Sequence, residues 1–331
     1  MKSIVKGNNG IYLSREYSDT IKGILIILIV IGHNHVLCPN TEAGGIMEYL
    51  YMFHIAGFFI LPFFYDTRTS VTWESISQTI IRCWVPYFWI CFLCFMVMCI
   101  MRHQFDFGWE HIWAFFNGTQ SPIRKNFGFV FPWFLPTYCS FSIMLSFARK
   151  YSWLYCLFFI LSMCTLFMTW EQFYIFKNSI PLGIGLALSY FGVGVIAFEL
   201  NKYLVWAKYI GAILFILLSV CWWMSVPTEI FGQILWRLLP TQFFLTLLCI
   251  VPYINYGWLR LLGRFSLGIY LFHVFFANAT YMLLPHTVLW GWIGFVISLM
   301  IPLLMTMGIY RVAYLRKLLF PRSWNEFIHK G

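Results

Sequence analysis

The sequence predicts an all-α protein that crosses a membrane about ten times, and three observations support this. The 331 residues are 61% hydrophobic and only 10% charged. Soluble globular chains are about 25% charged, so this chain has too few charges to cover a surface that faces water. The apolar residues form continuous runs near the ~20 residues that a helix needs to cross a bilayer. Transmembrane strands are shorter and alternate in polarity, so a barrel is excluded.

Ten apolar runs are expected to form the spanning helices. We expect short links between them and a single integral-membrane domain over residues 1–331, with no soluble domain. The runs cover residues 21–38, 46–65, 79–101, 128–147, 151–169, 180–198, 207–225, 231–254, 261–284 and 289–311.

The distribution of Lys and Arg predicts which side each link faces. With ten spans, the links after the odd-numbered spans share one side, and the other links share the opposite side with both termini. Of the 22 Lys and Arg residues, 17 lie on the side of the termini, and Arg237 lies inside a span. The positive-inside rule therefore places both termini in the cytoplasm. The remaining four residues, expected outside, are Arg102, Arg124, Lys125 and Lys177.

The net charge of +10 therefore reflects membrane topology. The expected partner is the bilayer with its anionic headgroups, and no nucleic acid is expected. The longest link, residues 102–127, is rich in tryptophan and phenylalanine and carries Trp109, Trp113, Phe115 and Phe116. This composition suits an amphipathic segment in the membrane interface. A lid over an outward-facing site is the alternative, and the sequence leaves both open.

Ionisable side chains inside the spans indicate a functional cavity, because such groups are unfavourable in hydrocarbon. Lys22 and His33 of the first span are eleven residues apart. They therefore lie within about 20° of one helical face and about 16 Å apart along the axis. Lys22 is expected near the cytoplasmic headgroups and His33 beyond the midplane. A histidine can exchange a proton near neutral pH, as a general base must. A purely structural histidine is the alternative.

Three other spans bring polar side chains to a similar depth. His54 lies in the second span and Arg237 in the eighth, while Tyr270 and His273 share one face of the ninth. Together with His33 they predict a polar cavity, with independent structural roles as the alternative. The sequence has no metal-ligand spacing and no Gly-rich nucleotide loop, so no metal and no permanently bound cofactor are expected.

Arg82 opens the third span at the expected cytoplasmic end. A guanidinium group can hold a phosphate by two parallel hydrogen bonds, although Arg82 could equally be an anchor that obeys the positive-inside rule. Lys22 and Arg82, with Arg68 and Arg264, are expected to line a basic mouth that suits a large cytoplasmic anion such as coenzyme A.

Five short motifs occur in order along residues 15–280. They are Lys22-Gly23 with His33 ten residues after the glycine, Phe53-His54-Ile55-Ala56-Gly57-Phe58-Phe59, Arg82 before Pro86-Tyr87, Pro132-Trp133-Phe134-Leu135, and Ser266 to His273. In this order they resemble the membrane acyltransferase-3 family, and more narrowly its fucose 4-O-acetylase-like branch of bacterial polysaccharide O-acetyltransferases.

The resemblance implies a multi-pass enzyme of the bacterial inner membrane. Such an enzyme moves an acyl group, usually acetyl, from cytoplasmic acyl-CoA to a sugar hydroxyl of a surface polysaccharide or lipid-linked glycan. His33 matches the catalytic histidine of the family, Lys22 its basic residue before glycine, and Arg82 one arginine of its donor-binding pair. Thr79 replaces the other arginine, and residues 61–63 read Leu-Pro-Phe where the family has Ser-Gly-Phe.

Acyl transfer needs a base for the hydroxyl proton and a partner for the developing oxyanion. His33 is the expected base, with an acylated nucleophile as its less favoured role, and acetyl-CoA is a co-substrate. His54, Arg237, Tyr270 and His273 are expected to orient the acceptor or to stabilise the oxyanion. The alternative function is a transporter or flippase-like protein that moves a small anion or glycan through the same cavity. The sequence shows no matched pair of broken helices, the usual indication of a transporter site.

Overall fold

The computed structural model describes residues 4–7, 10–39, 45–65, 71–129, 131–204, 206–224 and 229–328, with side chains except at 4–7, 10–11, 170, 229–237 and 328. The chain divides into two compact units. The first unit comprises Met1–Thr67 and Val193–Gly308, and the second comprises Arg68–Gly192 and Ile309–Gly331. The prediction of a single domain over 1–331 stays a prediction.

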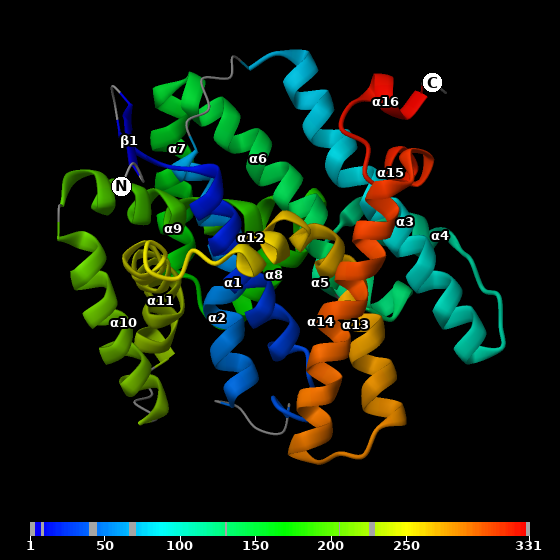
Figure 1. The fold of residues 1–331 in the computed structure, drawn as a ribbon. Helices are drawn as coiled ribbons and strands as arrows, with labels where there is room; N and C mark the ends of the chain where they lie inside the picture. Colours follow the sequence, from blue (N-terminus) through cyan, green and yellow to red (C-terminus); the bar gives the residue numbers. More distant parts are fainter. Residues whose placement is uncertain are drawn as a thin grey trace. The chain divides into compact units, whose positions relative to one another are not determined.

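The first unit contains a short hairpin, the two helices that follow it, and helices from the later part of the chain (Figure 1). Its elements are β1 (Ile4–Gly7), β2 (Gly10–Leu13), α1 (Arg15–Gly32), α2 (Ile46–Ile60), η1 (Leu61–Phe64), α10 (Ala207–Trp223), α11 (Glu229–Ile250), α12 (Gly257–Arg264) and α13 (Ser266–Leu283). Two helices, α9 (Ile184–Tyr203) and α14 (Val288–Arg311), contain the boundaries between the units. The antiparallel β1–β2 pair is a short addition to the predicted all-α class, and its β-branched and aromatic residues favour extended backbone.

Within the first unit, α1 packs most closely against α12, and two glycines permit the contact. A methyl group on Gly23 would overlap the carbonyl oxygen of Leu259, and one on Gly263 would overlap that of Asp19. The glycine that follows Lys22 therefore has a structural role, since any side chain there would push the two helices apart. Glu16 and Arg260 form an ion pair across the same contact, at 3.1 Å.

Two predicted spans of the first unit have different bounds in the structure. The span expected at 21–38 is a helix that begins at Arg15 and ends at Gly32, so His33 is the residue that caps its C-terminus. The span expected at 261–284 is interrupted at Phe265, which separates α12 from α13. The prediction of one continuous helix is wrong there, because α12 buries Leu259 and Leu262 on one side and keeps Arg264 exposed on the other.

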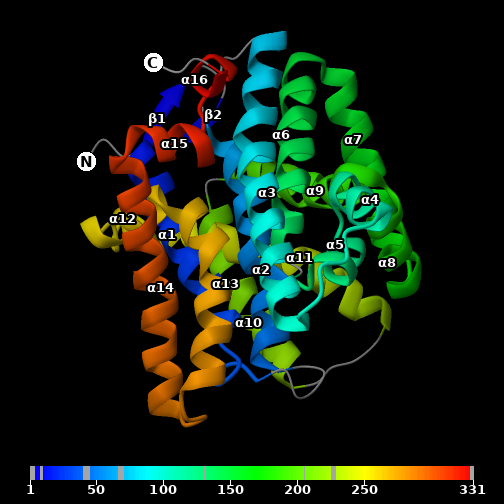
Figure 2. The ribbon, with the colours of Figure 1, turned by 90° about the vertical axis from the view of Figure 1, so that its right-hand side faces the viewer.

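The second unit contains the long helix α3 and the segments packed along it (Figure 2). Its elements are α3 (Trp73–Arg102), α4 (Trp109–Asn117), α5 (Gln120–Phe127), η2 (Phe131–Trp133), α6 (Phe134–Lys150), α7 (Ser152–Cys164), η3 (Thr165–Phe167), α8 (Trp170–Ser179), η4 (Pro181–Gly183), α15 (Ala313–Leu319) and α16 (Trp324–Ile328). A reciprocal pair of hydrogen bonds between Thr72 and Ser75 caps the start of α3. Beside α3 lies α6, followed by α7, while α15 and α16 contact α3 elsewhere along its length.

The link over residues 102–127 folds into two short helices, α4 and α5. Ala114 of this link is buried while Trp109, Trp113 and Phe116 are exposed, and its amphipathic character stays a prediction. The hydroxyl of Tyr87 donates to the carbonyl oxygen of Phe115 at 2.9 Å and thereby fixes α4 to α3. Whether the segment lies in the interface or acts as a lid stays open.

Five helical segments among the described residues are long and apolar enough to cross a membrane. They are Ile46–Phe64, Trp73–Arg102, Pro181–Tyr203, Ser266–Leu283 and Val288–Arg311, and shorter apolar helices occur at Ser152–Phe167, Ala207–Trp223 and Leu238–Ile250. These lengths agree with a helical membrane protein. The number of ten spans and the cytoplasmic location of both termini remain predictions.

Candidate functional site

His33 lies at the C-terminal end of α1 and is half-buried. Its Nδ1 is 2.8 Å from the carbonyl oxygen of Ile29, one turn earlier in the helix. A carbonyl can only accept a hydrogen bond, so Nδ1 carries the hydrogen atom and Nε2 of the neutral ring holds a lone pair. The backbone of α1 therefore orients the ring and leaves Nε2 able to accept a proton.

Two more predicted histidines join His33 in the first unit. The ring centroid of His273, from α13, lies 4.9 Å from that of His33. His54, from α2, is completely buried and belongs to the same cluster through Tyr51. Nδ1 of His54 faces the carbonyl oxygen of Leu50, and Nδ1 of His273 faces that of Tyr270 at 2.7 Å. All three neutral rings consequently have Nε2 as an acceptor, and Nε2 of His54 has no hydrogen-bond partner among the described residues.

Tyr51 is a member of this cluster that the sequence analysis missed. Its ring centroid lies 5.4 Å from that of His33 and 5.1 Å from that of His54. The spacing of three residues between Tyr51 and His54 in α2 was the available signal, because such pairs share a helical face. The predicted Tyr270 is also buried, with its ring centroid 5.8 Å from that of His273.

Asn34 was also missed, although it follows His33 directly. Its Nδ2 donates to the carbonyl oxygen of Gly291 in α14 at 2.8 Å. Its Oδ1 accepts from the backbone N–H groups of Val36 and Leu37 at 3.1 and 3.0 Å. The buried amide of Asn34 thus connects α14 to the segment that follows α1. It thereby holds His33 in place at the end of α1.

Lys22 lies in α1, on the other side of the helix midpoint from His33. Its Nζ is 2.7 Å from Oδ1 of Asp19, and Nε of Arg15 lies 4.0 Å from Oδ2 of the same carboxylate. The Asp19 side chain is 8% exposed and that of Lys22 is 26% exposed. An anion that binds Lys22 would therefore have to share the ammonium group with Asp19.

Arg82 belongs to the second unit and is exposed. Its Nε donates to the carbonyl oxygen of Arg322 at 2.9 Å, which leaves the terminal amino groups of the guanidinium for other partners. Thr79, which stands where the family has another arginine, donates its hydroxyl to the carbonyl oxygen of Ser75 in its own helix. Because threonine is neutral, Thr79 does not replace the positive charge of that arginine.

Arg237 lies in α11, but its side chain is outside the described residues.

Among the side chains that the structure describes, no group of three or more His, Cys, Asp or Glu residues is arranged to hold a metal ion. The histidine cluster is defined here as Tyr51, His33, His54 and His273, and the Nε2 atoms of its three neutral histidine rings are acceptors suited to hydroxyl groups and protons.

The family comparison fits this arrangement. The model of the acyltransferase-3 family, which describes an acyltransferase domain, matches residues 15–311. That range begins with α1 and ends with α14, so it includes every residue of the histidine cluster as well as Lys22 and Arg82. No curated protein matches the chain, and no solved structure does. Because the family model covers most of its length, the chain belongs to the acyltransferase-3 family of membrane acyltransferases.

Proposed function

We propose that the chain is an O-acyltransferase with His33 as its general base. It would move an acyl group, acetyl by default, from cytoplasmic acyl-CoA to a hydroxyl group of a cell-surface polysaccharide or lipid-linked glycan, in the inner membrane of a bacterium. The observation that carries the proposal is the histidine cluster, in which the hydrogen bond from His33 to Ile29 leaves Nε2 of His33 as a proton acceptor. Family membership favours this function over the transporter alternative.

In the proposed reaction, Nε2 of His33 takes the proton of the acceptor hydroxyl as its oxygen attacks the thioester carbonyl. The new C–O bond forms, the C–S bond breaks, and the proton passes from His33 to the departing thiolate to give free CoA. General base catalysis of this kind raises the rate by a factor of about 10²–10⁴.

The tautomers suggest how the remaining residues divide the work. His54 and His273 have Nε2 as an acceptor, which suits them to orient acceptor hydroxyls. A developing oxyanion needs donors instead. We therefore assign that role to Arg237 and to the hydroxyl of Tyr270.

The proposal assigns the phosphates of the donor to Lys22 and Arg82. Both side chains carry N–H groups that can donate hydrogen bonds to a phosphate. Lys22 is already paired with Asp19, so we expect its contribution to donor affinity to be smaller than that of an unpaired cation.

The test uses the purified full-length protein in nanodiscs with radiolabelled acetyl-CoA and no acceptor. We expect slow release of CoA that His33→Ala abolishes. His35→Ala is the matched control, because the His35 ring lies 5.3 Å from that of Tyr281 and outside the histidine cluster. Equal release by His33→Ala and wild type would contradict the assignment of His33 as base. If well-folded protein neither binds acetyl-CoA nor releases CoA, this result would favour the transporter.

A further inference from the structure

The C-terminal segment of the second unit, residues 312–328, packs against α3 through α15 and α16 (Figure 2). The indole N–H of Trp89 donates to the carbonyl oxygen of Leu318 at 3.0 Å. Closer to the start of α3, Nε of Arg82 donates to the carbonyl oxygen of Arg322 at 2.9 Å. Two hydrogen bonds to backbone carbonyls therefore fix the segment to α3, one of them made by a residue that the proposed function assigns to the donor.

Arg316 of this segment has one donor group that the chain does not use. Its Nη2 pairs with Oε1 of Glu326, and Oε2 of the same carboxylate accepts from the backbone N–H of Arg322 at 2.7 Å. Nη1 of Arg316 is buried and has no hydrogen-bond partner among the described residues. A buried donor on a charged group is unfavourable without a partner, so this atom indicates a ligand that accepts hydrogen bonds.

Three guanidinium groups are connected through this contact, and we call Arg82, Arg316 and Arg322 the arginine cluster. The terminal amino groups of Arg82 remain available, because only its Nε contacts the segment. The side chain of Arg322 forms no ion pair within 4 Å among the described residues. The charges of Arg316 and Arg322 both act on the carboxylate of Glu326. Because Glu326 is the one acidic partner in this set, the arginine cluster has positive charge in excess.

A phosphate group fits the arginine cluster. A guanidinium group can donate two parallel hydrogen bonds to a phosphate, and several such groups suit a ligand with more than one phosphate. An arginine that only anchors a chain at the headgroups extends its charged end into water. The side chain of Arg316 is instead 18% exposed and turned toward Glu326. This geometry favours a ligand bound by the protein over a headgroup of the surrounding bilayer.

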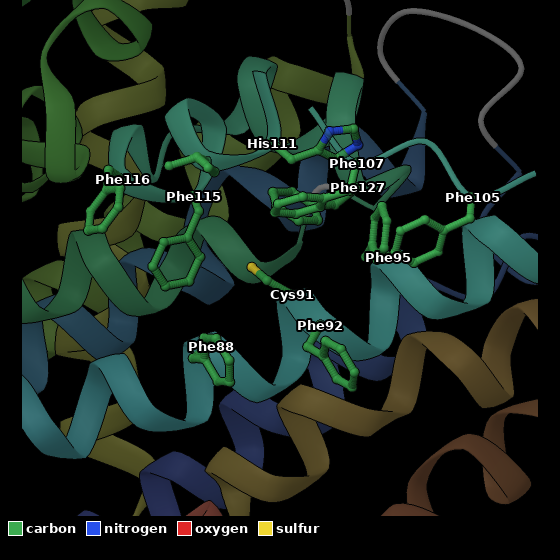
Figure 3. A pocket seen from close by; sticks show the side chains of 11 residues that line it. Phe88, Cys91, Phe92, Phe95, Phe105, Phe107, His111, Phe115, Phe116 and Phe127 are labelled. Atoms are coloured by element: carbon green, nitrogen blue, oxygen red, sulfur yellow. The ribbon is translucent and has the colours of Figure 1, made fainter. Parts of the chain in front are cut away.

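The apolar pocket of the same unit does not suit such a ligand (Figure 3). The pocket has a volume of about 470 Å³ and lies between the C-terminal half of α3, with Phe88 and Phe92, and the side chains of residues 105–127. No polar atom is exposed in its wall. A phosphate there would lose its hydration without gaining a donor.

We propose that Arg316 and Arg322 of the C-terminal segment complete a phosphate-binding site with Arg82, and that this site holds the phosphates of the acyl-CoA donor. CoA carries a diphosphate and a 3′-phosphate, which gives the arginine cluster several acceptors. The inference rests on the proposed function and adds two donor-binding residues beyond residue 311, where the match to the family model ends. Glu326 is a positioning residue, because its two oxygen atoms hold Arg316 and the backbone of Arg322.

The experiment measures the Kd of the full-length protein for CoA in phosphatidylcholine nanodiscs by isothermal titration calorimetry. Arg322→Gln is the principal variant, because the backbone groups of Arg322 that contact Arg82 and Glu326 remain. We expect its Kd to rise about tenfold or more, as the loss of charge-assisted hydrogen bonds to a phosphate predicts. Arg102→Gln is the matched control, since it removes the same charge from an exposed position at the other end of α3. Its Kd should equal that of wild type.

Arg316→Lys tests the buried donor group. Lysine keeps a positive charge for Glu326 but lacks the second amino group of the guanidinium. The affinity for CoA should therefore fall about tenfold, while α15 and α16 stay as protected from hydrogen exchange as in wild type. Should this variant lose that protection, Arg322→Gln decides.

Competition distinguishes the two sources of phosphate. Inorganic pyrophosphate should displace CoA, and sulfate at the same ionic strength should compete more weakly. CoA should increase the protection of α15 and α16 in phosphatidylcholine nanodiscs, and phosphatidylglycerol nanodiscs without CoA should not. Equal protection by phosphatidylglycerol alone, with no further effect of CoA, would overturn the proposal and assign the arginine cluster to lipid headgroups.

The remaining outcomes separate this inference from the proposed function. CoA binding by wild type that Arg322→Gln leaves unchanged would overturn the inference alone. Tighter binding by Arg322→Gln would also overturn it, since the segment would then obstruct the donor. A wild type that binds no CoA would overturn both the inference and the assignment of the donor. Binding of CoA needs neither a thioester nor a base, so none of these results depends on His33.

Discussion

The imidazole rings of His33 and His273 meet edge to face, with centroids 4.9 Å apart and planes at 78°. His273→Phe keeps an aromatic ring at this contact and removes both nitrogen atoms. We expect the turnover number for acyl transfer to fall by about 10²-fold, the size typical of a lost acid–base or hydroxyl-orienting group. The KM for acetyl-CoA should not change. Steady-state kinetics with His286→Phe as the control, an exposed histidine, would check this, and unchanged turnover would remove His273 from the reaction.

The contact between Gly23 and α12 predicts a large effect of a single methyl group. Gly23→Ala should destabilise the protein by about 1–3 kcal/mol, as overpacking of a close contact does, and lower its melting temperature in detergent. Gly308→Ala is the matched control, because a methyl group there would have no atom within 4 Å. Equal melting temperatures for the two variants would show that α1 and α12 can separate without loss.

Asn34 predicts a link between the end of α1 and catalysis. Asn34→Ala removes three hydrogen bonds and leaves the buried carbonyl group of Gly291 without its donor. A lost buried partner costs about 1–3 kcal/mol, and we expect CoA release to fall with it because His33 is the neighbouring residue. Asn126→Ala, which loses one bond within α5, is the control. Normal CoA release by Asn34→Ala would limit Asn34 to a role in stability.

Glu326 predicts a pH-dependent contact in the C-terminal segment. Burial acts to raise its pKa, but the backbone N–H of Arg322 and the guanidinium of Arg316 both donate to the carboxylate, and together they hold its pKa below the usual value. The ionised form is therefore stabilised in the folded state. Its contribution to stability is complete above the pKa of an unfolded glutamate, about 4.3, and is lost as the pH falls through the lower folded value.

Hydrogen exchange of α15 and α16 measures this contribution. Wild type should be better protected than Glu326→Gln at neutral pH, and the difference should vanish in acid. A difference that persists at low pH would mean that packing, and not the charge of Glu326, holds the segment.

The sequence predicted the positions of several helices closely. Apolar runs are local, and the bilayer imposes the same length on each of them, so the runs at 79–101 and 289–311 correspond closely to α3 and α14. The break at Phe265 was missed because the apolar residues continue across it. The β1–β2 hairpin was missed because its strands have four residues each, too short to show a clear period.

By itself, the sequence determined the helical membrane class and the family, and it led to the proposal of His33 as the base, because length, hydropathy and short motifs are properties of neighbouring residues. Only the tertiary structure decided which side chains meet. It joined Tyr51 to His33, tied Asn34 to Gly291, and enclosed the pocket between α3 and α4. The physical reason is that packing brings together side chains from segments that are far apart in the sequence. Such contacts cannot be read from the residues that are adjacent along the chain.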